Sequence, residues 1–435
     1  MGQGRHLKTN HANGRKRNAH TRRGRSLKAF LSVAAVLLVV LGVSFSGLLH
    51  TGWIVPTVSG LFAPAATATP APTQQPTPTP APTPVVETVT FSATGDNLIH
   101  SAIYEQAQRN ATGDAAYDFS SCYAHMADFY ADYDVNWINQ ETLVNSELEP
   151  STYPCFSTPG ECAQALYDIG FRVFSLSNNH SYDKGSTGIA ATRRFWSGMP
   201  SDVVTTGLWA GSEDYDRIPT QTVNGITIAY LSYTEHTNGI PTPSQAEAHV
   251  IYTSETDVIQ HQVQLARQQA DVVVVGVHWG VEDSHTITDA QRALAQNLAD
   301  WGADLIIGTH PHVLQDAQWL TAADGRQAFV AYSLGNFIST QKQADNLVGG
   351  VLTLTMQKTT QPDGTVSVAL QQPKIHPVVT HYSAGTQDIA TYLYRDYTPE
   401  LASSHGARNR GTALDYDRIT SIIETNISPE FLDMN

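Results

Sequence analysis

Short apolar runs rich in Val, Ile, Leu and Phe recur along the chain, and segments with helical spacing lie between them. The apolar runs predict β-strands at Val89–Thr94, Phe171–Leu176, Ile226–Tyr233, Val272–Val277 and Ala303–Ile307. Helices are predicted at 123–133, at 258–269 and between the capping box Thr288-Asp-Ala-Gln291 and Gly302. This alternation indicates an α/β domain built on a parallel sheet with right-handed crossovers.

Two further local patterns refine this prediction. Thr158-Pro159-Gly160-Glu161 has the composition of a helix start, with Thr158 as the N-cap and Gly170 at the end of the helix. After Gly350, two strand-like runs flank Pro362-Asp-Gly364, which predicts an antiparallel hairpin. Residues 386–435 are weakly patterned and are treated as a C-terminal extension, with one short helix expected at 419–425.

The N-terminal 49 residues divide sharply by charge and hydropathy. Residues 1–28 hold nine of the 25 Lys and Arg residues and no acid, and the run Ala29–Leu49 has 21 residues and no charge. About 20 helical residues span a bilayer, and basic flanks stay in the cytoplasm. We therefore expect a cytoplasmic tail (1–28), one transmembrane helix (29–49) and an extracytoplasmic remainder. A cleaved signal peptide is the alternative, although the cleavage-like Ala66-Thr-Ala68 lies well beyond the run.

The remaining chain is acidic, with 16 basic residues against all 40 acids, a net charge of −24. Eight prolines between Pro64 and Pro84 predict an extended linker over 50–86, which is followed by a folded domain over 87–385. Nucleic acid could account for the basic tail, but the adjoining apolar run makes membrane topology the simpler cause, so no nucleic-acid partner is expected. Outside the cell one disulfide could form, with Cys155 and Cys162 as the favoured pair, or Cys122, Cys155 and Cys162 could all stay free.

Five apolar runs, far apart in the sequence, end in residues that can bind metal. The potential ligands at these ends are Asp96, Glu141, Asn179, His278, His310 and His312. Open α/β sheets bind ligands beyond the carboxyl ends of their strands, so these side chains are expected to converge. Taken singly, each is more simply explained as a polar surface or turn residue. Mixed nitrogen and oxygen donors suit Mn, Fe, Zn or Co better than Ca or Mg, so the pattern predicts a transition-metal centre.

Six motifs between residues 88 and 380 carry a family resemblance. They are Gly95-Asp96, Asn139-Gln-Glu141, Leu176-Ser-Asn-Asn-His180 with Asp183, His278-Trp279-Gly280-Val-Glu282, Gly308-Thr-His-Pro-His-Val-Leu-Gln315 and Tyr332-Ser-Leu-Gly-Asn-Phe337. Together they resemble bacterial capsule synthesis proteins of CapA type, a family linked to poly-γ-glutamate production and export. That family is similar to calcineurin-like metallophosphoesterases, whose fold is a four-layer α/β/β/α sandwich around a two-metal centre.

The resemblance implies a role for each matching residue. Asp96, Glu141, Asn179, His278, His310 and His312 fall on metal-ligand positions. His180 falls on a catalytic histidine that protonates a leaving oxygen, and Asp183 would orient it. Four residues within the motifs are predicted to support the site: Asn139, Trp279, Glu282 and Asn336. Leu98 departs from the metallophosphoesterase pattern, which has a metal-binding histidine at this position, and His100 is out of register.

Two functions follow from these expectations. One is a membrane-anchored, extracytoplasmic metal-dependent hydrolase or transferase that acts during capsule polymer assembly or export. The other is a non-catalytic scaffold or polymer-binding subunit of a capsule synthase or export complex, to which Leu98 and the long linker point. The expected partners are membrane-embedded synthase or export proteins and an anionic polymer such as poly-γ-glutamate. Because the domain is acidic, contact with a polyanion is expected at a chain end rather than along a groove.

Overall fold

The computed structural model describes residues 83–243 and 246–435. The basic tail, the apolar run 29–49 and almost all of the linker lie outside these residues. Within the described part of the chain, no helix combines the length and the apolar character needed to cross a bilayer.

The first sheet has eight strands and mixed directions. Its central strand is β1 (Val85–Asn97). On one side of β1 follow three strands that run parallel to it, β2 (Val135–Asn139), β5 (Phe171–Ser175) and β6 (Val204–Thr206). On the other side of β1 an antiparallel group follows, formed by β14 (Val348–Thr360), β15 (Val366–Ser383) and β16 (Gln387–Leu393). The short strand β13 (Asn336–Ile338) pairs with the end of β1.

The second sheet has six strands, and its middle is parallel. Its order is β11 (Leu314–Thr321), β12 (Gln327–Leu334), β10 (Leu305–Thr309), β9 (Val272–His278), β8 (Ile226–Thr234) and β7 (Thr220–Val223). The strands β12, β10, β9 and β8 are parallel, whereas β11 and β7 close the two edges as antiparallel partners. A separate two-stranded ribbon is formed by β3 (Val144–Asn145) and β4 (Thr158–Pro159).

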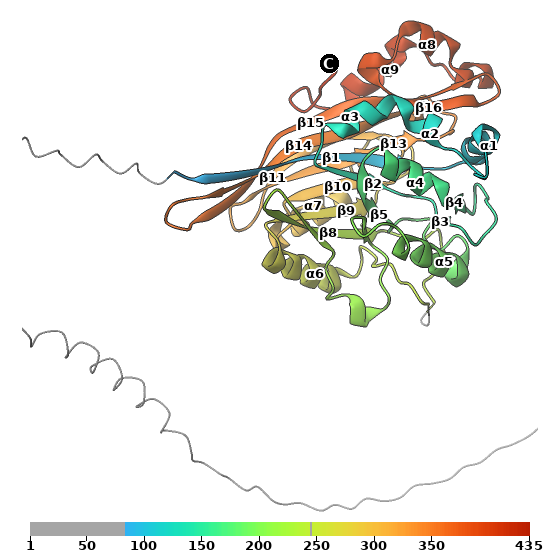
Figure 1. The fold of residues 1–435 in the computed structure, drawn as a ribbon. Helices are drawn as coiled ribbons and strands as arrows, with labels where there is room; N and C mark the ends of the chain where they lie inside the picture. Colours follow the sequence, from blue (N-terminus) through green and yellow to red (C-terminus); the bar gives the residue numbers. More distant parts are fainter. Residues whose placement is uncertain (1–82, 244–245) are drawn as a thin grey trace, which may run out of the picture. The chain divides into compact units, whose positions relative to one another are not determined.

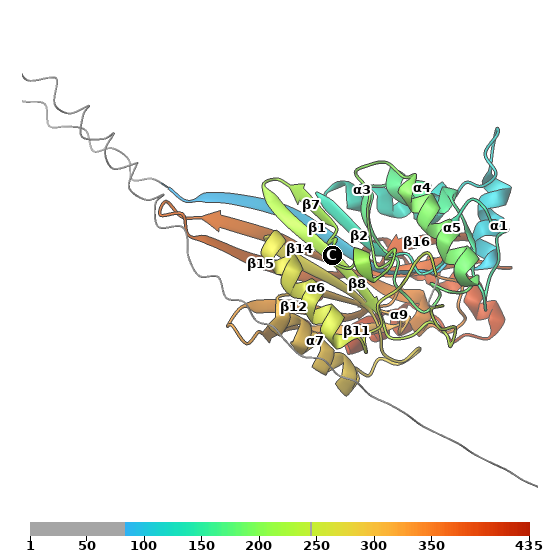
Figure 2. The ribbon, with the colours of Figure 1, turned by 90° about the horizontal axis from the view of Figure 1, so that it is seen from below.

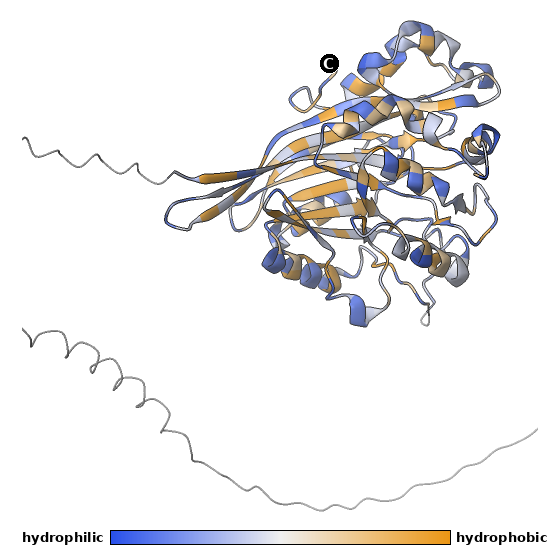
Figure 3. Cartoon of the chain, in the orientation of Figure 1, coloured by the Kyte–Doolittle hydropathy of each residue, from blue (hydrophilic) through white to orange (hydrophobic). Residues whose placement is uncertain are grey.

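The two sheets pack face to face. A Cβ atom on Gly276 of β9 would lie 2.8 Å from the Trp137 ring of β2, and the hydroxyls of Ser175 and Ser232 are 2.6 Å apart across the interface. Apolar side chains from both sheets fill the space between them. Figure 3 shows many hydrophobic residues along the strands of the two sheets. Such close packing leaves no room for bulkier side chains at these positions.

Helices cover the outer faces of both sheets (Figures 1 and 2). The eight-stranded sheet is covered by α1 (Ser101–Asn110), α2 (Ser120–Tyr123), α3 (Ala127–Ala131) and α4 (Glu161–Asp168). The six-stranded sheet is covered by α6 (Thr256–Gln269) and α7 (Asp289–Trp301). The layers therefore run helix, sheet, sheet, helix. The remaining α-helices of the described residues are α5 (Gly185–Ser197), α8 (Pro399–Ser404) and α9 (Tyr416–Asn426).

Several local predictions are confirmed and others need correction. Thr288 forms the predicted capping box, and β14 and β15 form the predicted hairpin. The prediction that Thr158 caps a helix is wrong, because Thr158 lies in β4, its hydroxyl donates to the Thr142 hydroxyl (2.7 Å), and the N-cap of α4 is Gly160. Both sheets combine parallel strands with antiparallel ones. The helix expected at 123–133 is divided into α2, a 3₁₀ turn and α3.

The region after residue 385 belongs to the same packed unit as the rest of the described domain. Strand β16 pairs with β15, and the buried isoleucines of α9 join the main apolar core. The side chain of Gln106 in α1 both donates to and accepts from the backbone of Ile389. These residues complete one edge of the eight-stranded sheet.

All three cysteines are free thiols, so the expected Cys155–Cys162 disulfide is wrong. Cys162 lies on α4 in the core, where its sulfur is 3.5 Å from both the Tyr123 hydroxyl and the Asn97 amide. Burial raises the pKa of Cys162 to about 11 and that of Cys122 to about 12, which keeps both thiols protonated.

Candidate metal centre

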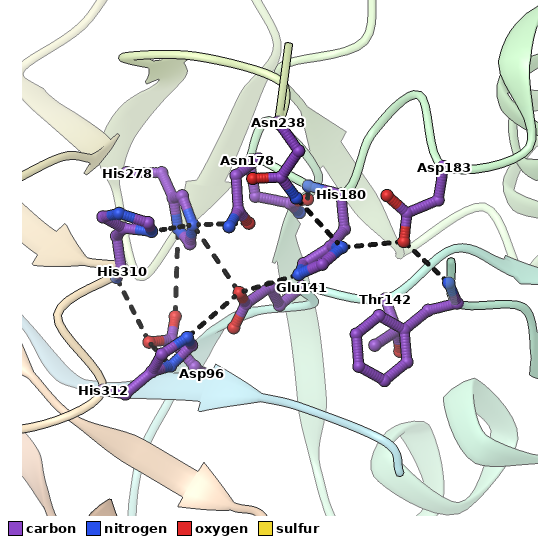
Figure 4. A network of polar contacts seen from close by, with 12 residues as sticks. Asp96, Glu141, Thr142, Asn178, His180, Asp183, Asn238, His278, His310 and His312 are labelled. Atoms are coloured by element: carbon purple, nitrogen blue, oxygen red, sulfur yellow. Dashed lines mark hydrogen bonds and ion pairs between the residues drawn. The ribbon is translucent and has the colours of Figure 1, made fainter. Parts of the chain in front are cut away.

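The carboxyl ends of strands from both sheets meet at one edge of the domain. Strands β1, β2 and β5 bring Asp96, Glu141 and the segment around His180 to this edge, and β9 and β10 bring His278 and His310. Figure 4 shows these side chains pointing toward one another. Because parallel strands share one carboxyl edge, two facing parallel sheets can place ligands on both walls of a single site.

Asp96 lies at the bottom of the centre and is completely buried. Its Oδ1 accepts a hydrogen bond from the Asn139 amide (2.7 Å), and its Oδ2 accepts one from the backbone N–H of His310 (3.2 Å). The preceding Gly95 is required by a close backbone approach, since a Cβ there would lie 1.9 Å from the carbonyl oxygen of Gly335. Asn139 and Gly95 thus fix the position of the carboxylate.

Glu141 is buried, and neither of its carboxylate oxygens accepts a hydrogen bond from any described residue. Three imidazole nitrogens surround Oε1: Nε2 of His312 at 3.6 Å, of His278 at 3.7 Å and of His180 at 3.9 Å. Burial raises the pKa of the Glu141 carboxyl well above its usual value, and the charge of Asp96 adds to this rise, whereas His312 opposes it. An unsatisfied buried carboxylate is costly unless a cation joins it.

His312 is held so that one ring nitrogen faces Glu141. Its Nδ1 lies 3.0 Å from the side-chain oxygen of Asn336, and the Asn336 amide donates to the carbonyl of Asn346 (2.9 Å). The Asn336 oxygen and Asp96 Oδ2, which is 3.3 Å away, both hold a proton on Nδ1, so Nε2 is the nitrogen that can bind a metal once it loses its proton. Asp96, Glu141 and His312 each offer a ligand atom, and these atoms lie within 4.8 Å of one another.

A second group of potential ligands lies on the other side of Glu141. His278 Nε2 is 3.0 Å from the side-chain oxygen of Asn179 and 3.1 Å from His310 Nδ1. His278 Nδ1 lies 3.0 Å from the Thr309 hydroxyl, which orients the ring. His310 and His312 both have positive φ (98° and 59°), so the backbone on either side of the intervening Pro is left-handed and not extended.

The protonation of the three imidazoles differs because their surroundings differ. Burial lowers the pKa of His278 well below its usual value and that of His310 to about 2, and the charge of His312 contributes to both shifts. For His312 burial also disfavours the cation, but the Glu141 charge and the contact with Asp96 outweigh it and raise the pKa to about 10. His278 and His310 are therefore neutral, the form that binds metal.

These residues fit a divalent metal site. At ligand distances of about 2.0–2.2 Å, two donors on one ion lie about 3.0–3.5 Å apart, which is close to the separations among Asn179, His278 and His310. The unsatisfied oxygens of Glu141 and Asn139 are the groups that a cation or its water shell would satisfy. A buried Asp, Glu and His cluster of this kind supports a divalent metal site.

His180 borders the centre and has a fixed orientation. Its Nδ1 lies 2.7 Å from Asp183, whose carboxylate also accepts the backbone N–H of Phe156 (2.7 Å). The ring packs edge to face on Phe156 at 4.7 Å, and the His180 backbone N–H donates to Asn178. Nε2 is thereby directed toward Glu141.

The other predicted residues lie in different surroundings. Trp279 points away from the centre into the apolar layer under α7, where its indole N–H donates to the Tyr332 carbonyl. Glu282 is exposed in the turn after β9, and its charge contributes to the raised pKa of Glu141. Leu98 is buried and brings no ligand, while His100 accepts the backbone N–H of Thr340.

Sequence reasoning missed two residues near the centre. His236 packs edge to face on His310 at 5.1 Å, and the Asn238 amide lies 3.4 Å from His180 Nδ1. The predicted strand Ile226–Tyr233 also ends in polar residues, and this sixth strand end was the available signal.

The family model for "Bacterial capsule synthesis protein PGA_cap" matches residues 90–341, more than half of the chain. The chain belongs to this family. It is 34% identical over 184 residues to the PGA biosynthesis protein CapA of Bacillus subtilis (strain 168), and this match covers 42% of this chain and 47% of that protein. It is 30% identical over 261 residues to the capsule biosynthesis protein CapA of Bacillus anthracis, and this match covers 59% of this chain and 61% of that protein. The matches thus span about half to three fifths of these curated relatives.

Among solved structures, the NAD nucleotidase NadN of Haemophilus influenzae aligns with 80% of this chain and 64% of its own. The sequence identity is 13% and the TM-score is 0.39, which is too low to support an inference about fold or activity. The residues at the strand ends therefore carry the chemical interpretation.

Proposed function

We propose that this protein binds divalent metal ions where its two sheets meet and uses them in the assembly or export of a capsule polymer such as poly-γ-glutamate. The observation that carries the proposal is Glu141. Its carboxylate is buried, neither oxygen is hydrogen-bonded to a described residue, and three imidazole nitrogens lie within 3.9 Å. Membership of the capsule synthesis family supports the biological role.

Two ions would share the centre, with Glu141 between them. One ion would be held by Asp96 and His312, and the other by Asn179, His278 and His310. This mixture of imidazole, amide and carboxylate donors suits Mn, Fe or Zn. A bound divalent ion supplies Lewis acidity to a phosphoryl or carbonyl oxygen.

The chain's own residues would position the reactants and move a proton. Asp183 and Phe156 orient the His180 ring, so that Nε2 faces the centre and can deliver a proton to a leaving oxygen. Asn139 and Asn336 fix the orientations of Asp96 and His312. The reaction proposed is hydrolysis or transfer at a phosphate or amide bond of a polymer or its precursor.

The cellular setting is also part of the proposal. The apolar run 29–49 would anchor the protein in the cell membrane, with the basic tail in the cytoplasm and the metal centre outside. The partners would be membrane-embedded synthase or export proteins, and the polymer would meet the centre at a chain end, because the acidic domain repels a polyanion elsewhere.

The test is metal analysis of the purified full-length protein, paired with capsule complementation. The wild type should retain a transition metal after dialysis, and an Asp96→Ala/His310→Ala double variant should lose both the metal and complementation. His261→Ala is the matched control, since His261 is an exposed histidine on α6 paired with Asp216. A wild type that holds no metal and hydrolyses neither phosphoester nor γ-glutamyl substrates would exclude this function.

A non-catalytic role is the second candidate, and Leu98 favours it because it brings no imidazole to the centre. The variant His180→Ala separates the two candidates, since it leaves all six proposed ligands in place. An enzyme should lose complementation while keeping its metal. A scaffold or polymer-binding subunit should keep both.

A further inference from the structure

The loop that follows β8 holds two exposed polar side chains next to the metal centre. The His236 ring lies 5.1 Å from the His310 ring, edge to face. The Asn238 amide is 3.4 Å from His180 Nδ1, as Figure 4 shows. Neither side chain is among the proposed ligands. Their position beside His310 and His180 suggests a role in binding whatever reaches the centre.

Three hydrogen bonds hold this loop in one conformation. The Thr234 hydroxyl donates to the carbonyl of His236 (2.9 Å), and the Thr237 hydroxyl donates to the carbonyl of Ile240 (2.6 Å). The Glu235 carboxylate accepts the backbone N–H of Gly280 after β9 (2.9 Å). A loop that is already ordered loses little backbone entropy when it binds a ligand.

The loop also determines which ring nitrogen of His236 can donate. Asn238 has φ +50°, a left-handed conformation that Asn tolerates, and its backbone N–H donates to His236 Nδ1 (3.3 Å). We therefore assign the ring proton to Nε2. Within residues 83–243 and 246–435, Nε2 makes no hydrogen bond, so its N–H group is available to a ligand.

The exposed neighbours of the metal centre lie on this loop. Asp96 and Glu141 are 0% and 1% exposed and His180 is 5% exposed, whereas His236 and Asn238 are exposed side chains. Among these residues, the two loop side chains are therefore the ones in contact with solvent.

We propose that His236 and Asn238 recognise an anionic oxygen of the substrate, a phosphoryl or carboxylate oxygen, by donating hydrogen bonds from Nε2–H and from the side-chain amide. The proposal rests on the proposed metal centre. The domain outside residues 1–28 carries a net charge of −24, so an anion is repelled by most of its surface and needs local donors. Rim donors would hold the anion while the metal ions approach its other oxygens.

The test measures binding of inorganic phosphate and of glutamate to the full-length, Mn²⁺-loaded protein by calorimetry, with metal content measured in parallel. His236→Phe keeps an aromatic ring against His310 but removes the donor, and His236→Gln keeps a donor. Asn238→Gly removes the amide without backbone strain, and Asn224→Gly is its matched control because Asn224 has φ +48° in an exposed turn.

His236→Phe and Asn238→Gly should each weaken binding of at least one anion by roughly tenfold or more, the loss expected for one hydrogen bond to a charged group. His236→Gln and Asn224→Gly should bind like the wild type, and all variants should keep their metal. The anion that loses more affinity identifies the substrate class. Unchanged binding by His236→Phe and Asn238→Gly, or no anion binding by the metal-loaded wild type, would overturn the proposal, whereas a metal-free wild type would overturn the proposed function itself.

Discussion

Replacing Glu141 with Gln should shift the stability of the metal-free and the metal-loaded protein in opposite directions. In the metal-free protein both carboxylate oxygens are buried and without a hydrogen bond from the described residues. An unsatisfied buried polar group costs about 1–3 kcal/mol. A Gln amide has nearly the same shape, carries no charge and can donate to or accept from the imidazole of His312, 3.6 Å away. The metal-free variant should therefore be more stable than the wild type by about 1–2 kcal/mol.

The expected change in melting temperature follows from the size of the domain. For about 350 described residues and an unfolding entropy near 2.1 cal/mol/K per residue, 1 kcal/mol corresponds to about 1.4 °C, so Tm should rise by about 1–3 °C. With metal at 1,000 times Kd, the wild type should gain about 4 kcal/mol, or about 6 °C. If loss of the carboxylate weakens metal binding about 100-fold, the variant should gain only about 2 °C.

Scanning calorimetry in EDTA and in MnCl₂ measures both effects. Glu147→Gln is the matched control, because Glu147 is an exposed carboxylate paired with Arg194 at 2.8 Å and should not alter the metal-dependent shift. A Glu141→Gln protein that melts lower without metal and keeps the full shift with metal would refute the reasoning. Glu141 would then be neither an unsatisfied group nor a ligand.

Three further changes test the site and the fold. Asn336→Ala removes the acceptor 3.0 Å from His312 Nδ1 and should weaken metal binding about 10–100-fold, as measured by dye competition, while Asn336→Asp should weaken it less. Gly95→Ala places a Cβ 1.9 Å from the carbonyl oxygen of Gly335 and should lower the free energy of unfolding in urea by about 3 kcal/mol, and a loss below about 1 kcal/mol would contradict the close approach. Burial lowers the pKa of His405 to about 4, below the unfolded value near 6.5, so its stabilising effect is complete above pH 6.5 and is lost as the pH falls toward 4. When the pH falls from 7.5 to 4.5 in EDTA, the free energy of unfolding of His405→Gln should therefore decrease by about 2–3 kcal/mol less than that of the wild type. Equal decreases would argue against a buried neutral imidazole.

Much of the site could be predicted from the sequence because strand ends are marked locally. A buried parallel strand is a continuous apolar run, so the polar residue that ends it is conspicuous, as at Asp96, His278 and His310. The same argument applied to the strand ending at Thr234 would have directed attention to His236. Whether these residues bind metal remains a prediction, although the structure brings them together.

Other features depended on contacts between distant segments. Thr158 has the local signature of a helix cap, but it pairs with Val144 of β3 and its hydroxyl donates to Thr142. Cys155 and Cys162 are only seven positions apart, but the Cys162 sulfur lies in the core beside the Tyr123 hydroxyl and does not pair with Cys155. Trp279 lies in a site motif and nevertheless points into the opposite layer, because adjacent strand residues face opposite sides.

The chain alone determined the positions of most strands, the capping box of α7 and the types of side chain available for chemistry, because these depend on spacing and on neighbours within a few residues. Only the tertiary structure decided that two mixed sheets face each other, that β16 completes one of them, and that Glu141 lies among three imidazoles from different segments. Those arrangements arise from burial and backbone pairing between residues 40 to 280 positions apart, and local sequence patterns do not specify which distant segments meet.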